Sequence, residues 1–570
     1  MAYDLLVKNA RVIDGSGAPA FRGDVGVCDG KIAAIGKLRG IARRTIDADG
    51  LVVTPGFVDT HCHYDAQVTW DPLCTFSCYH GVTSVIIGNC SLALAPVRPG
   101  GKERLSEFLS YVEAIPMEVL QTIDVTWETI PEYMATLDKR LGVNVGNLIG
   151  HTAVRHYVMG SESQGRPATR NEIEAMREIV REAITAGALG LSLSKVQGHY
   201  DPQGVRIPAL WANDDEIFAL GDVLAELGTG VIQAGGGRIP EMKDRLMSRL
   251  SETTGRQVVY SNLCYLAKDP EGWKHQMAVV DETVKSGIRA NPMVSPNRTT
   301  YRFTMRNSQV FRGVPTWHPI LIAKDEDKLR AYRDPDVRKK LHHEIVEWTA
   351  PPSNPMVGPR WMDTIWVDKP VLPKNECLQG KSIRQLAEAQ GKGIIDAFLD
   401  LVVEEDLDTG FMLEAQNTDS EIMAKLLNYP NAYIGLSDGG AHVQFRGGTD
   451  YSTQLLSYWV RERGIMSLEH AVKQLTFDSA SVFGIYDRGL LRPGLAADIA
   501  IFDPDTISPL PSDKVHDLPA GAWRLRELPT GIHYTIVNGE VLIEKGVPTG
   551  ALPGRVLRNA LYHTRTEESC

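Results

Sequence analysis

Two histidines separated by one residue, His61 and His63, have a type and spacing that could do chemistry. They directly follow residues 56–59, a short apolar run that is typical of a buried strand. Residues i and i+2 of a strand point to the same side, so we expect the two imidazoles to face the same way. Because neutral imidazole nitrogens bind borderline cations such as Zn²⁺, this pair predicts a divalent-metal site.

Two other residues of metal-binding type follow apolar runs elsewhere in the chain. Cys90 comes after residues 84–88, and its thiolate could bind the same ion. Asp438 comes after residues 433–436, and its carboxylate could both touch a metal and accept a proton from water. The alternatives are a small buried cysteine and an aspartate that begins a turn before glycines. The residues alone leave these alternatives open.

Four further polar residues lie where they could complete such a site. His151 follows residues 145–149, Lys195 and His199 follow residues 189–193, and His442 lies four residues after Asp438. His151 and His199 could each bind the metal, orient a carbonyl or polarise it. We expect His151 to be catalytic, and Lys195, His199 and His442 to bind substrate. A lone histidine is more often structural, and a lysine there is also compatible with a solvated charge.

Short apolar runs recur along the chain between these residues, and helical stretches separate most of them. This alternation predicts βα units that close a parallel sheet, and active sites gather at the carboxyl ends of such strands. One connecting helix is well marked, because Thr169 and Glu172 form a capping box before an apolar face. The eight candidate strands are residues 56–59, 84–88, 145–149, 189–193, 231–234, 258–261, 288–291 and 433–436. The expected fold is an α/β protein with a (β/α)8 TIM-type barrel.

Both ends of the chain differ from the middle, since residues 1–55 and 486–570 contain short alternating strands with Asp-Gly and Asn-Gly turns. We expect the two ends to form one small β-sandwich and residues 56–485 to form the barrel. Residues 295–376 interrupt the barrel pattern with a long segment rich in Trp, Arg and Pro. This insertion is either a lid over the mouth of the site or a peripheral packing surface.

Composition excludes several classes of protein. The chain has 570 residues and a net charge of −11, which disfavours binding to nucleic acid because phosphate backbones require clustered Lys and Arg. It contains no run of about 18 apolar residues and no signal sequence, so we expect no membrane association and a cytoplasmic location. Eight cysteines without a CxxC pair indicate mostly reduced thiols.

Several longer segments identify a family. The chain resembles the amidohydrolase superfamily and, within it, the N-acyl-D-amino-acid deacylases (D-aminoacylases) of amidohydrolase family 3. The resemblance implies a metal-binding barrel with a small β-sandwich, a metal-ligating cysteine at Cys90 and a general acid/base at Asp438. The matching segments are residues 5–15, 55–63, 81–90, 434–442 and 494–499, of which the second and fourth are the most specific.

The chain departs from that family in the middle of the barrel. D-aminoacylases supply two further histidine ligands there, whereas the candidate strands here are followed by Gln233-Ala234, Ser261-Asn262 and Ala290-Asn291. We therefore expect one ion, most simply Zn²⁺, bound by His61, His63, Asp438 and Cys90. One Zn²⁺ with an open position suffices to activate water. Some superfamily members carry a carboxylated lysine at the position of Lys195, but we favour a role in substrate binding.

The predicted activity is hydrolysis of the amide C–N bond of a small N-acylated compound, such as an N-acyl-D-amino acid, by metal-activated water. A second hypothesis is a metal-assisted reaction that cleaves no amide, such as C–C bond cleavage or another lyase step, since the missing histidines could mark a repurposed site. A third is a non-catalytic scaffold, which the joint presence of His61, His63, Cys90 and Asp438 disfavours.

Overall fold

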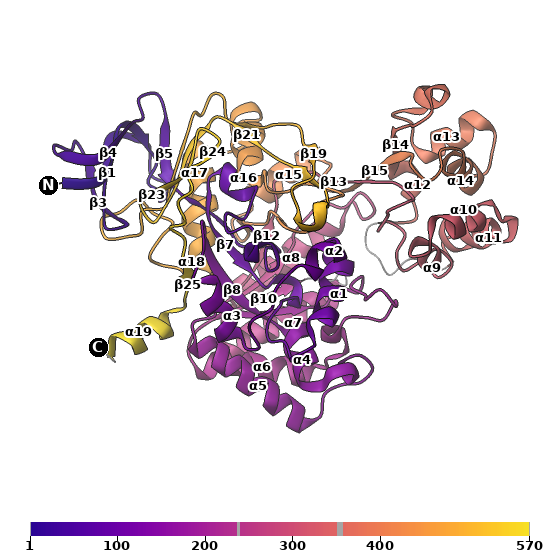
Figure 1. Ribbon diagram of the computed structural model, residues 1–570, viewed down its shortest axis with the longest axis horizontal. Helices are drawn as coiled ribbons and strands as arrows, with labels where there is room; N and C mark the ends of the chain where they lie inside the picture. The colour runs from indigo at the N-terminus through magenta and orange to yellow at the C-terminus, as the bar shows by residue number, and fades with distance from the viewer. Residues whose placement is uncertain (1, 236–239, 350–356, 569–570) are drawn as a thin grey trace.

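The computed structural model describes residues 2–235, 240–349 and 357–568, with the backbone alone for residues 240–245 and 565–568. Its centre is a parallel sheet in which each strand pairs with the next, in the order β16-β12-β11-β10-β9-β8-β7-β6 (Figure 1). All eight strands lie at or beside the predicted segments. They are β6 (Phe57–Asp59), β7 (Val82–Ile87), β8 (Asn144–Gly150), β9 (Gly190–Ser194), β10 (Val231–Gly235), β11 (Val258–Ser261), β12 (Ala290–Val294) and β16 (Tyr433–Ile434).

The sheet closes into a barrel where β6 meets β16. His61 and Leu436 form a parallel bridge, and the Thr60 amide donates to the Gly435 carbonyl at 2.9 Å. The carboxylate of Asp59 also crosses this seam and accepts hydrogen bonds from the backbone and hydroxyl of Ser437. The α/β barrel predicted from the sequence is therefore confirmed.

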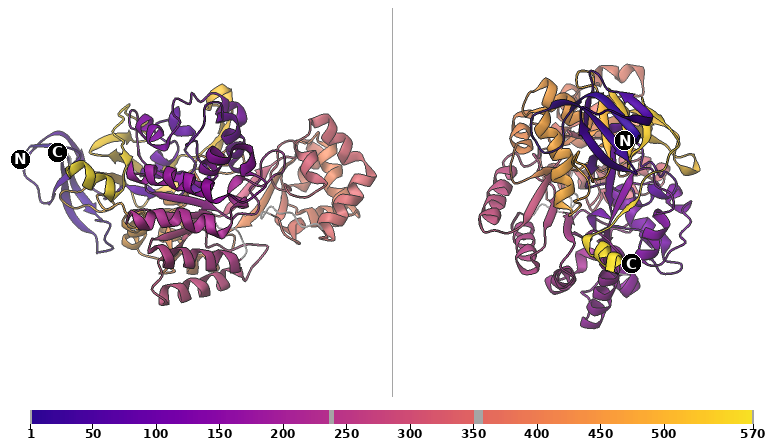
Figure 2. Two further views of the ribbon diagram at one scale, coloured as in Figure 1. Left: turned by 90° about the horizontal axis from the view of Figure 1, so that it is seen from below. Right: turned by 90° about the vertical axis from the view of Figure 1, so that its left-hand side faces the viewer.

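Apolar side chains fill the barrel interior and the space beneath its outer helices. Successive strands contribute inward-facing residues such as Val58, Ile86, Leu148 and Val259, all almost fully buried. Outside, helix α5 (Arg170–Thr185) begins at the predicted capping box, since the Thr169 hydroxyl accepts from the Glu172 amide. The helices that follow successive strands cover the outer face (Figure 2), and they include α4 (His151–Met159), α6 (Asp214–Glu226), α7 (Pro240–Thr254) and α8 (Gly272–Lys285).

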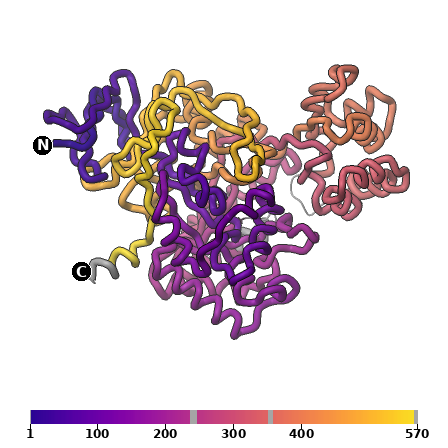
Figure 3. The backbone as a smooth tube through the Cα atoms, viewed as in Figure 1, coloured from indigo at the N-terminus to yellow at the C-terminus, as the bar shows by residue number. Residues whose placement is uncertain are grey.

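Both ends of the chain build one small β domain, as predicted. Strand β5 (Val52–Pro55) pairs antiparallel with β17 (Ile499–Phe502), so N-terminal and C-terminal segments lie side by side (Figure 3). Valine and isoleucine side chains from both ends share one buried cluster. The other strands of this sheet are β1 (Ala2–Val12), β2 (Phe21–Cys28), β3 (Lys31–Gly36), β4 (Ile41–Asp47), β22 (Ile532–Val537), β23 (Glu540–Glu544) and β24 (Val547–Pro548).

The segment between β12 and β16 folds into a compact unit with its own core. Its aromatic residues, including Phe311, Trp317, Trp361 and Phe398, stack in one buried cluster, which explains the Trp-rich composition. The unit projects away from the barrel on the side opposite the N-terminal strands (Figures 1 and 2). Its elements include β13 (Thr299–Phe303), α9 (Trp317–Leu321), α10 (Asp325–Arg333), α11 (Pro335–Leu341), α12 (Trp361–Thr364), β14 (Ile365–Lys369), α13 (Ile383–Gln390), α14 (Ile394–Glu404) and β15 (Gly410–Gln416).

This unit continues to β15, beyond residue 376 where the sequence pattern placed its end. The middle strand of its three-stranded antiparallel sheet is β15, between β13 and β14, so residues up to 416 are integral to it. Among the described helices of the whole chain, none combines the length and hydropathy that a membrane span requires. The remaining longer helices are α1 (Lys102–Glu113), α2 (Met117–Gln121), α3 (Ile130–Leu137), α15 (Ser420–Leu427), α17 (Leu468–Lys473) and α19 (Ala560–Glu568).

Candidate metal centre and catalytic site

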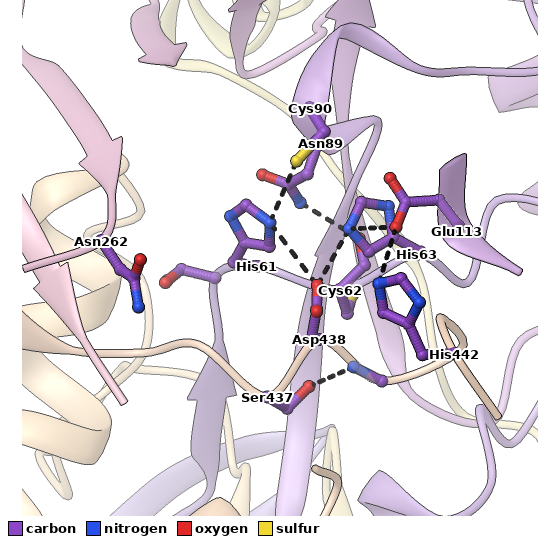
Figure 4. Close-up of polar contacts among 12 residues, drawn as sticks. His61, Cys62, His63, Asn89, Cys90, Glu113, Asn262, Ser437, Asp438 and His442 are labelled. Carbon is purple, nitrogen blue, oxygen red and sulfur yellow. Dashed lines mark hydrogen bonds and ion pairs between the residues drawn. The ribbon is translucent and has the colours of Figure 1, made fainter. Parts of the chain in front are cut away.

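Four of the predicted site residues converge at the carboxyl end of the barrel strands (Figure 4). His61 and His63 follow β6, Cys90 follows β7 and Asp438 follows β16. The His61 Nε2 atom lies 3.5 Å from the Cys90 Sγ atom and 3.8 Å from the Asp438 Oδ1 atom. The His63 Nε2 atom lies 3.1 Å from the same Asp438 oxygen. Both imidazoles are buried, so these side chains form one inward-facing group of donors.

The backbone around this group is held in unusual conformations. Cys90, Asp438 and His442 have φ values of 54°, 62° and 53°, in the left-handed region that non-glycine residues rarely adopt. Such strain costs on the order of 1–3 kcal/mol per residue and persists where the surrounding structure enforces it. Here the enforcing contacts are backbone hydrogen bonds, from the Asp438 amide to the His61 carbonyl at 3.0 Å and from the His63 amide to the Gly439 carbonyl at 2.7 Å.

The structure adds Glu113, which the sequence analysis did not identify. This residue ends α1 and is 3% exposed, and its Oε2 atom lies 3.6 Å from His63 Nε2 and 3.8 Å from His442 Nε2. His63, Glu113 and Asp438 thus form a second group of potential ligands that shares His63 with the group His61, His63 and Cys90. No local motif marks Glu113, because it is the last residue of an otherwise ordinary amphipathic helix.

These residues fit a divalent cation. The ring nitrogen Nδ1 of His61, both ring nitrogens of His63 and the Oε1 atom of Glu113 are buried without a hydrogen-bond partner in the structure. Leaving buried polar atoms unpaired costs free energy, and a bound cation would satisfy several of them. Imidazole, thiolate and carboxylate groups are also the donors that zinc prefers. The prediction of a metal site at His61 and His63 therefore has a physical basis in the geometry.

A second residue absent from the sequence analysis, Arg446, controls the charge of Asp438. Burial alone would raise the pKa of Asp438, but the Arg446 guanidinium and His63 lower it well below its usual range. Arg446 forms an ion pair with the Asp438 Oδ2 atom, and both side chains are largely buried. The Asp438 carboxylate is consequently ionised and oriented, as a proton acceptor must be.

A cavity of about 190 Å³ opens over these residues. His61, Cys90 and Asp438 form part of its wall, together with the predicted substrate-binding residues His199 and His442. Burial lowers the pKa of both of these histidines to about 3, with further lowering by His63 at His199 and by Arg446 at His442, so both imidazoles are neutral.

The insertion also reaches this cavity. Tyr301, Gln309 and Arg312 from the unit between β12 and β16 line its wall, so the insertion covers one side of the site. The Arg312 guanidinium lies 3.7 Å above the Tyr111 ring centroid, and it donates to the Tyr111 carbonyl. Burial lowers the pKa of Arg312 to about 10, and no ion pair joins it to an acid of the described residues. One wall of the cavity therefore comes from the insertion.

Two predicted site residues lie apart from the others. The His151 Nε2 atom is 2.8 Å from the Glu216 Oε1 atom, and Arg155 pairs with the other Glu216 oxygen. The Lys195 ammonium donates to the Ala212 carbonyl at 3.0 Å. Neither His151 nor Lys195 is among the residues that line the cavity. Both residues follow barrel strands, as residues of such a site often do. Their contacts in the structure are instead with Glu216 and with the Ala212 backbone.

Comparisons with known proteins agree with this architecture. Residues 44–344 and 361–543 match the Amidohydrolase family. The chain is 29% identical to the D-aminoacylase of Alcaligenes xylosoxydans xylosoxydans over 97% of both chains, and 27% identical to its N-acyl-D-glutamate deacylase over 97% of this chain and 96% of the relative.

A solved structure with the same fold is the N-acyl-D-glutamate deacylase from Bordetella bronchiseptica, complexed with zinc and a phosphonate inhibitor that mimics the tetrahedral intermediate. The two structures align with a TM-score of 0.67 and 24% identity, covering 98% of this chain and all of the other. The family match covers most of the chain, as does the barrel described above. The protein belongs to the amidohydrolase family.

Proposed function

We propose that this protein is a zinc-dependent hydrolase that cleaves the amide bond of N-acyl-D-amino acids. The observation that carries the proposal is that His61, His63, Cys90 and Asp438 lie close together at the carboxyl end of the barrel, where His61, Cys90 and Asp438 line one cavity. The names of the relatives, which are D-aminoacylase and N-acyl-D-glutamate deacylase, support the substrate class.

In this proposal His61, His63, Cys90 and Asp438 hold a single ion. When bound, a divalent cation there supplies Lewis-acid polarisation of the amide carbonyl and makes water more acidic. Zinc is favoured because a thiolate and two imidazoles prefer it to Mg²⁺ or Ca²⁺.

Asp438 performs the proton transfers in the proposed reaction. Its carboxylate is ionised because Arg446 and His63 lower its pKa, so it can accept a proton from the attacking water. It can then deliver that proton to the leaving nitrogen as the C–N bond breaks. The neutral His199 and His442 face the same cavity and are suited to hydrogen bonding with the acyl group or the amide.

Arg312 is the group best suited to recognise the carboxylate of an amino acid. It is a buried cation on the cavity wall, with Tyr111 as its neighbour and without an acidic partner among the ion pairs of the described residues. A substrate carboxylate would supply that partner, and guanidinium–carboxylate pairs are strong and directional. An N-acyl amino acid provides both this carboxylate and a hydrolysable amide.

The cysteines are compatible with the predicted reducing, cytoplasmic environment. In the described part of the chain, no disulfide is formed by Cys28, Cys62, Cys74, Cys78, Cys90 or Cys377. Disulfides are rare in reducing compartments, so this state supports the prediction. A free Cys90 is also a requirement of the proposed metal site.

The test is hydrolysis by purified, metal-analysed protein of a panel of N-acetyl-D- and N-acetyl-L-amino acids. We expect about one equivalent of zinc, release of the free D-amino acid, and a loss of kcat of on the order of 10²–10⁴-fold in Asp438→Asn with the fold retained. Metal-loaded protein that hydrolyses no amide would refute the proposal and favour a reaction that breaks another bond. Protein that binds no metal would remove its basis.

A further inference from the structure

Glu113 is a buried acid beside His63 and His442, and none of the roles described above uses it. Its side chain is 3% exposed, and its Oε1 atom has no hydrogen-bond partner in the structure. The chain supplies few other donors from the middle of the barrel, because no histidine occurs between His199 and His275, the segment that contains β10 and β11. A buried carboxylate beside two imidazoles therefore needs a partner.

The position of Glu113 relative to His63 separates two possible roles. A carboxylate that only orients a metal-bound histidine contacts the ring nitrogen that does not bind the metal. Glu113 instead faces Nε2 of His63 at 3.6 Å, the same nitrogen that faces Asp438 at 3.1 Å. Neither ring nitrogen of His63 has a hydrogen-bond partner in the structure, but Nε2 is the one that faces another candidate ligand, Asp438. Glu113 thus lies on the metal side of the ring, not behind it.

The distances agree with shared coordination. Zinc bonds of about 2.0–2.1 Å, with angles of about 90–120° between them in four- or five-coordinate arrangements, place neighbouring ligand atoms roughly 2.9–3.6 Å apart. The separations of His63 Nε2 from Asp438 and Glu113, 3.1 and 3.6 Å, lie in that range. The candidate ligand atoms of the three side chains all lie within 4.8 Å of one another, close enough to hold one ion.

The backbone fixes Glu113 in this position. The Glu113 carbonyl accepts a hydrogen bond from the His442 amide at 2.5 Å, which ties the end of α1 to the loop after β16. Phe108 and Leu109, earlier in α1, are 1% exposed and anchor the helix on the main core. The carboxylate is therefore held at the site before any ion binds.

We propose that Glu113 is a metal ligand, which binds the ion through its carboxylate together with His63 and Asp438. The inference rests on the proposed metal-dependent function, since it adds an acidic donor from α1 to a centre otherwise built at strand ends. An anionic donor there also adds negative charge to a site that already contains Cys90 and Asp438, and it strengthens the attraction for a divalent cation.

The direct test is a crystal structure of the wild-type protein loaded with zinc, with the ion located from its anomalous scattering. We expect a Glu113 oxygen about 2.0–2.2 Å from an ion that His63 also binds. An ion bound with every Glu113 oxygen more than about 3 Å away would overturn the inference, because zinc–oxygen bonds are not that long. This experiment does not depend on the folding of any variant.

Substitutions test the same point in solution by competition with a chelator. We expect Glu113→Gln to weaken zinc binding on the order of 100-fold, and Glu113→His to bind within about tenfold of wild type because imidazole is also a zinc ligand. The matched control is Glu107→Gln, which removes an acid from the same helix that pairs with Arg104 instead, and which should bind zinc like wild type.

Equal affinity in Glu113→Gln and wild type would contradict a ligand role, and so would equal losses in Glu113→Gln and Glu113→His. A failure of the Glu113 inference can be distinguished from a failure of the proposed function. Wild-type protein that binds zinc and hydrolyses amides, but with Glu113 remote from the ion, would refute only this inference.

Discussion

The buried cluster of His151, Glu216 and Arg155 offers a quantitative test of which polar residues maintain the fold. The Glu216 carboxylate lies between His151 and Arg155, 2.8 Å from His151 Nε2 and in contact with the Arg155 guanidinium, and all three side chains are at most 1% exposed. The perturbation is Glu216→Gln, which keeps the shape of the side chain but removes its charge.

The pKa of Glu216 sets the expected magnitude. Burial would raise this pKa, but His151 and Arg155 outweigh it and lower the value from 4.5 to about 2. At about 1.4 kcal/mol per pKa unit, this difference corresponds to about 3 kcal/mol of stability. Breaking a buried ion pair by removing one partner costs a similar 3–5 kcal/mol or so.

The sign follows from the direction of the shift. Because the folded-state pKa is depressed, the contribution is fully present above about pH 4.5 and is lost as the pH falls towards about 2. At pH 3.5 the same two pKa values leave about 2 kcal/mol. The difference in unfolding free energy between wild type and Glu216→Gln should therefore shrink from about 3 kcal/mol at pH 7 to about 2 kcal/mol at pH 3.5.

The assay is urea denaturation of metal-free wild type and variant at both pH values, with a chelator present so that loss of metal does not contribute. Glu226→Gln is the control, since Glu226 lies on the same helix but pairs with Arg177 and Arg181 at the surface, and it should cost less than about 1 kcal/mol. A difference of less than about 1 kcal/mol for Glu216→Gln at pH 7 would refute the argument. A Glu216→Gln variant that is as stable as wild type and binds metal but has no activity would also refute the argument. That result would favour a catalytic role for His151.

Two further predictions follow from the site and from a helix terminus. Arg312→Ala should raise the KM for N-acyl-D-amino acids by roughly 10–100-fold, because it removes a charge-assisted contact with the substrate carboxylate. The KM for an amide without a carboxylate should not change. Equal effects on both substrates would contradict carboxylate recognition. Thr169→Ala should lower the free energy of unfolding by about 1 kcal/mol without changing activity, because it removes the capping hydroxyl of α5. An unchanged urea midpoint would show that this cap does not stabilise the protein.

The barrel could be predicted from the sequence because its strands are buried on both faces. Buried strands appear as short apolar runs bounded by turn residues, and all eight runs correspond to barrel strands. Boundaries were less certain. The strand predicted at residues 288–291 is β12, Ala290–Val294, so it begins and ends later than predicted. The polar Asn291 lies inside this strand, and its side-chain amide donates to the Asn431 carbonyl.

The candidate site was predictable only where its residues are next to strands. His61, His63, Cys90 and Asp438 each follow an apolar run, so chain position alone brings them to one edge of the barrel. Glu113 comes from the end of a helix, and its proximity to the site depends on how α1 packs. Such long-range packing leaves no periodic signal in a single sequence.

Arg446 and Arg312 were missed for a related reason. Both lie in long connections without regular patterning, and what distinguishes them is burial of a charge, which only the fold reveals. His151 is a contrasting case. It follows a barrel strand as a catalytic residue would, but it begins α4 and meets Glu216 of α6, an acid that the sequence could not place beside it.

The closure of the barrel at β6 and β16 has a consequence for how the protein acquires its metal. The Asp59–Ser437 contact at this seam joins positions 378 residues apart, so it forms only after residue 437 of the 570 has been synthesised. Bringing the ends of such a long loop together costs about 5 kcal/mol of chain entropy, before constant terms. His61 and Asp438 lie on opposite sides of the same seam, so a ribosome-bound chain that lacks β16 has only a partial set of ligands. Complete coordination by the proposed ligands therefore requires closure of this seam, and a bound ion would stabilise the closed barrel.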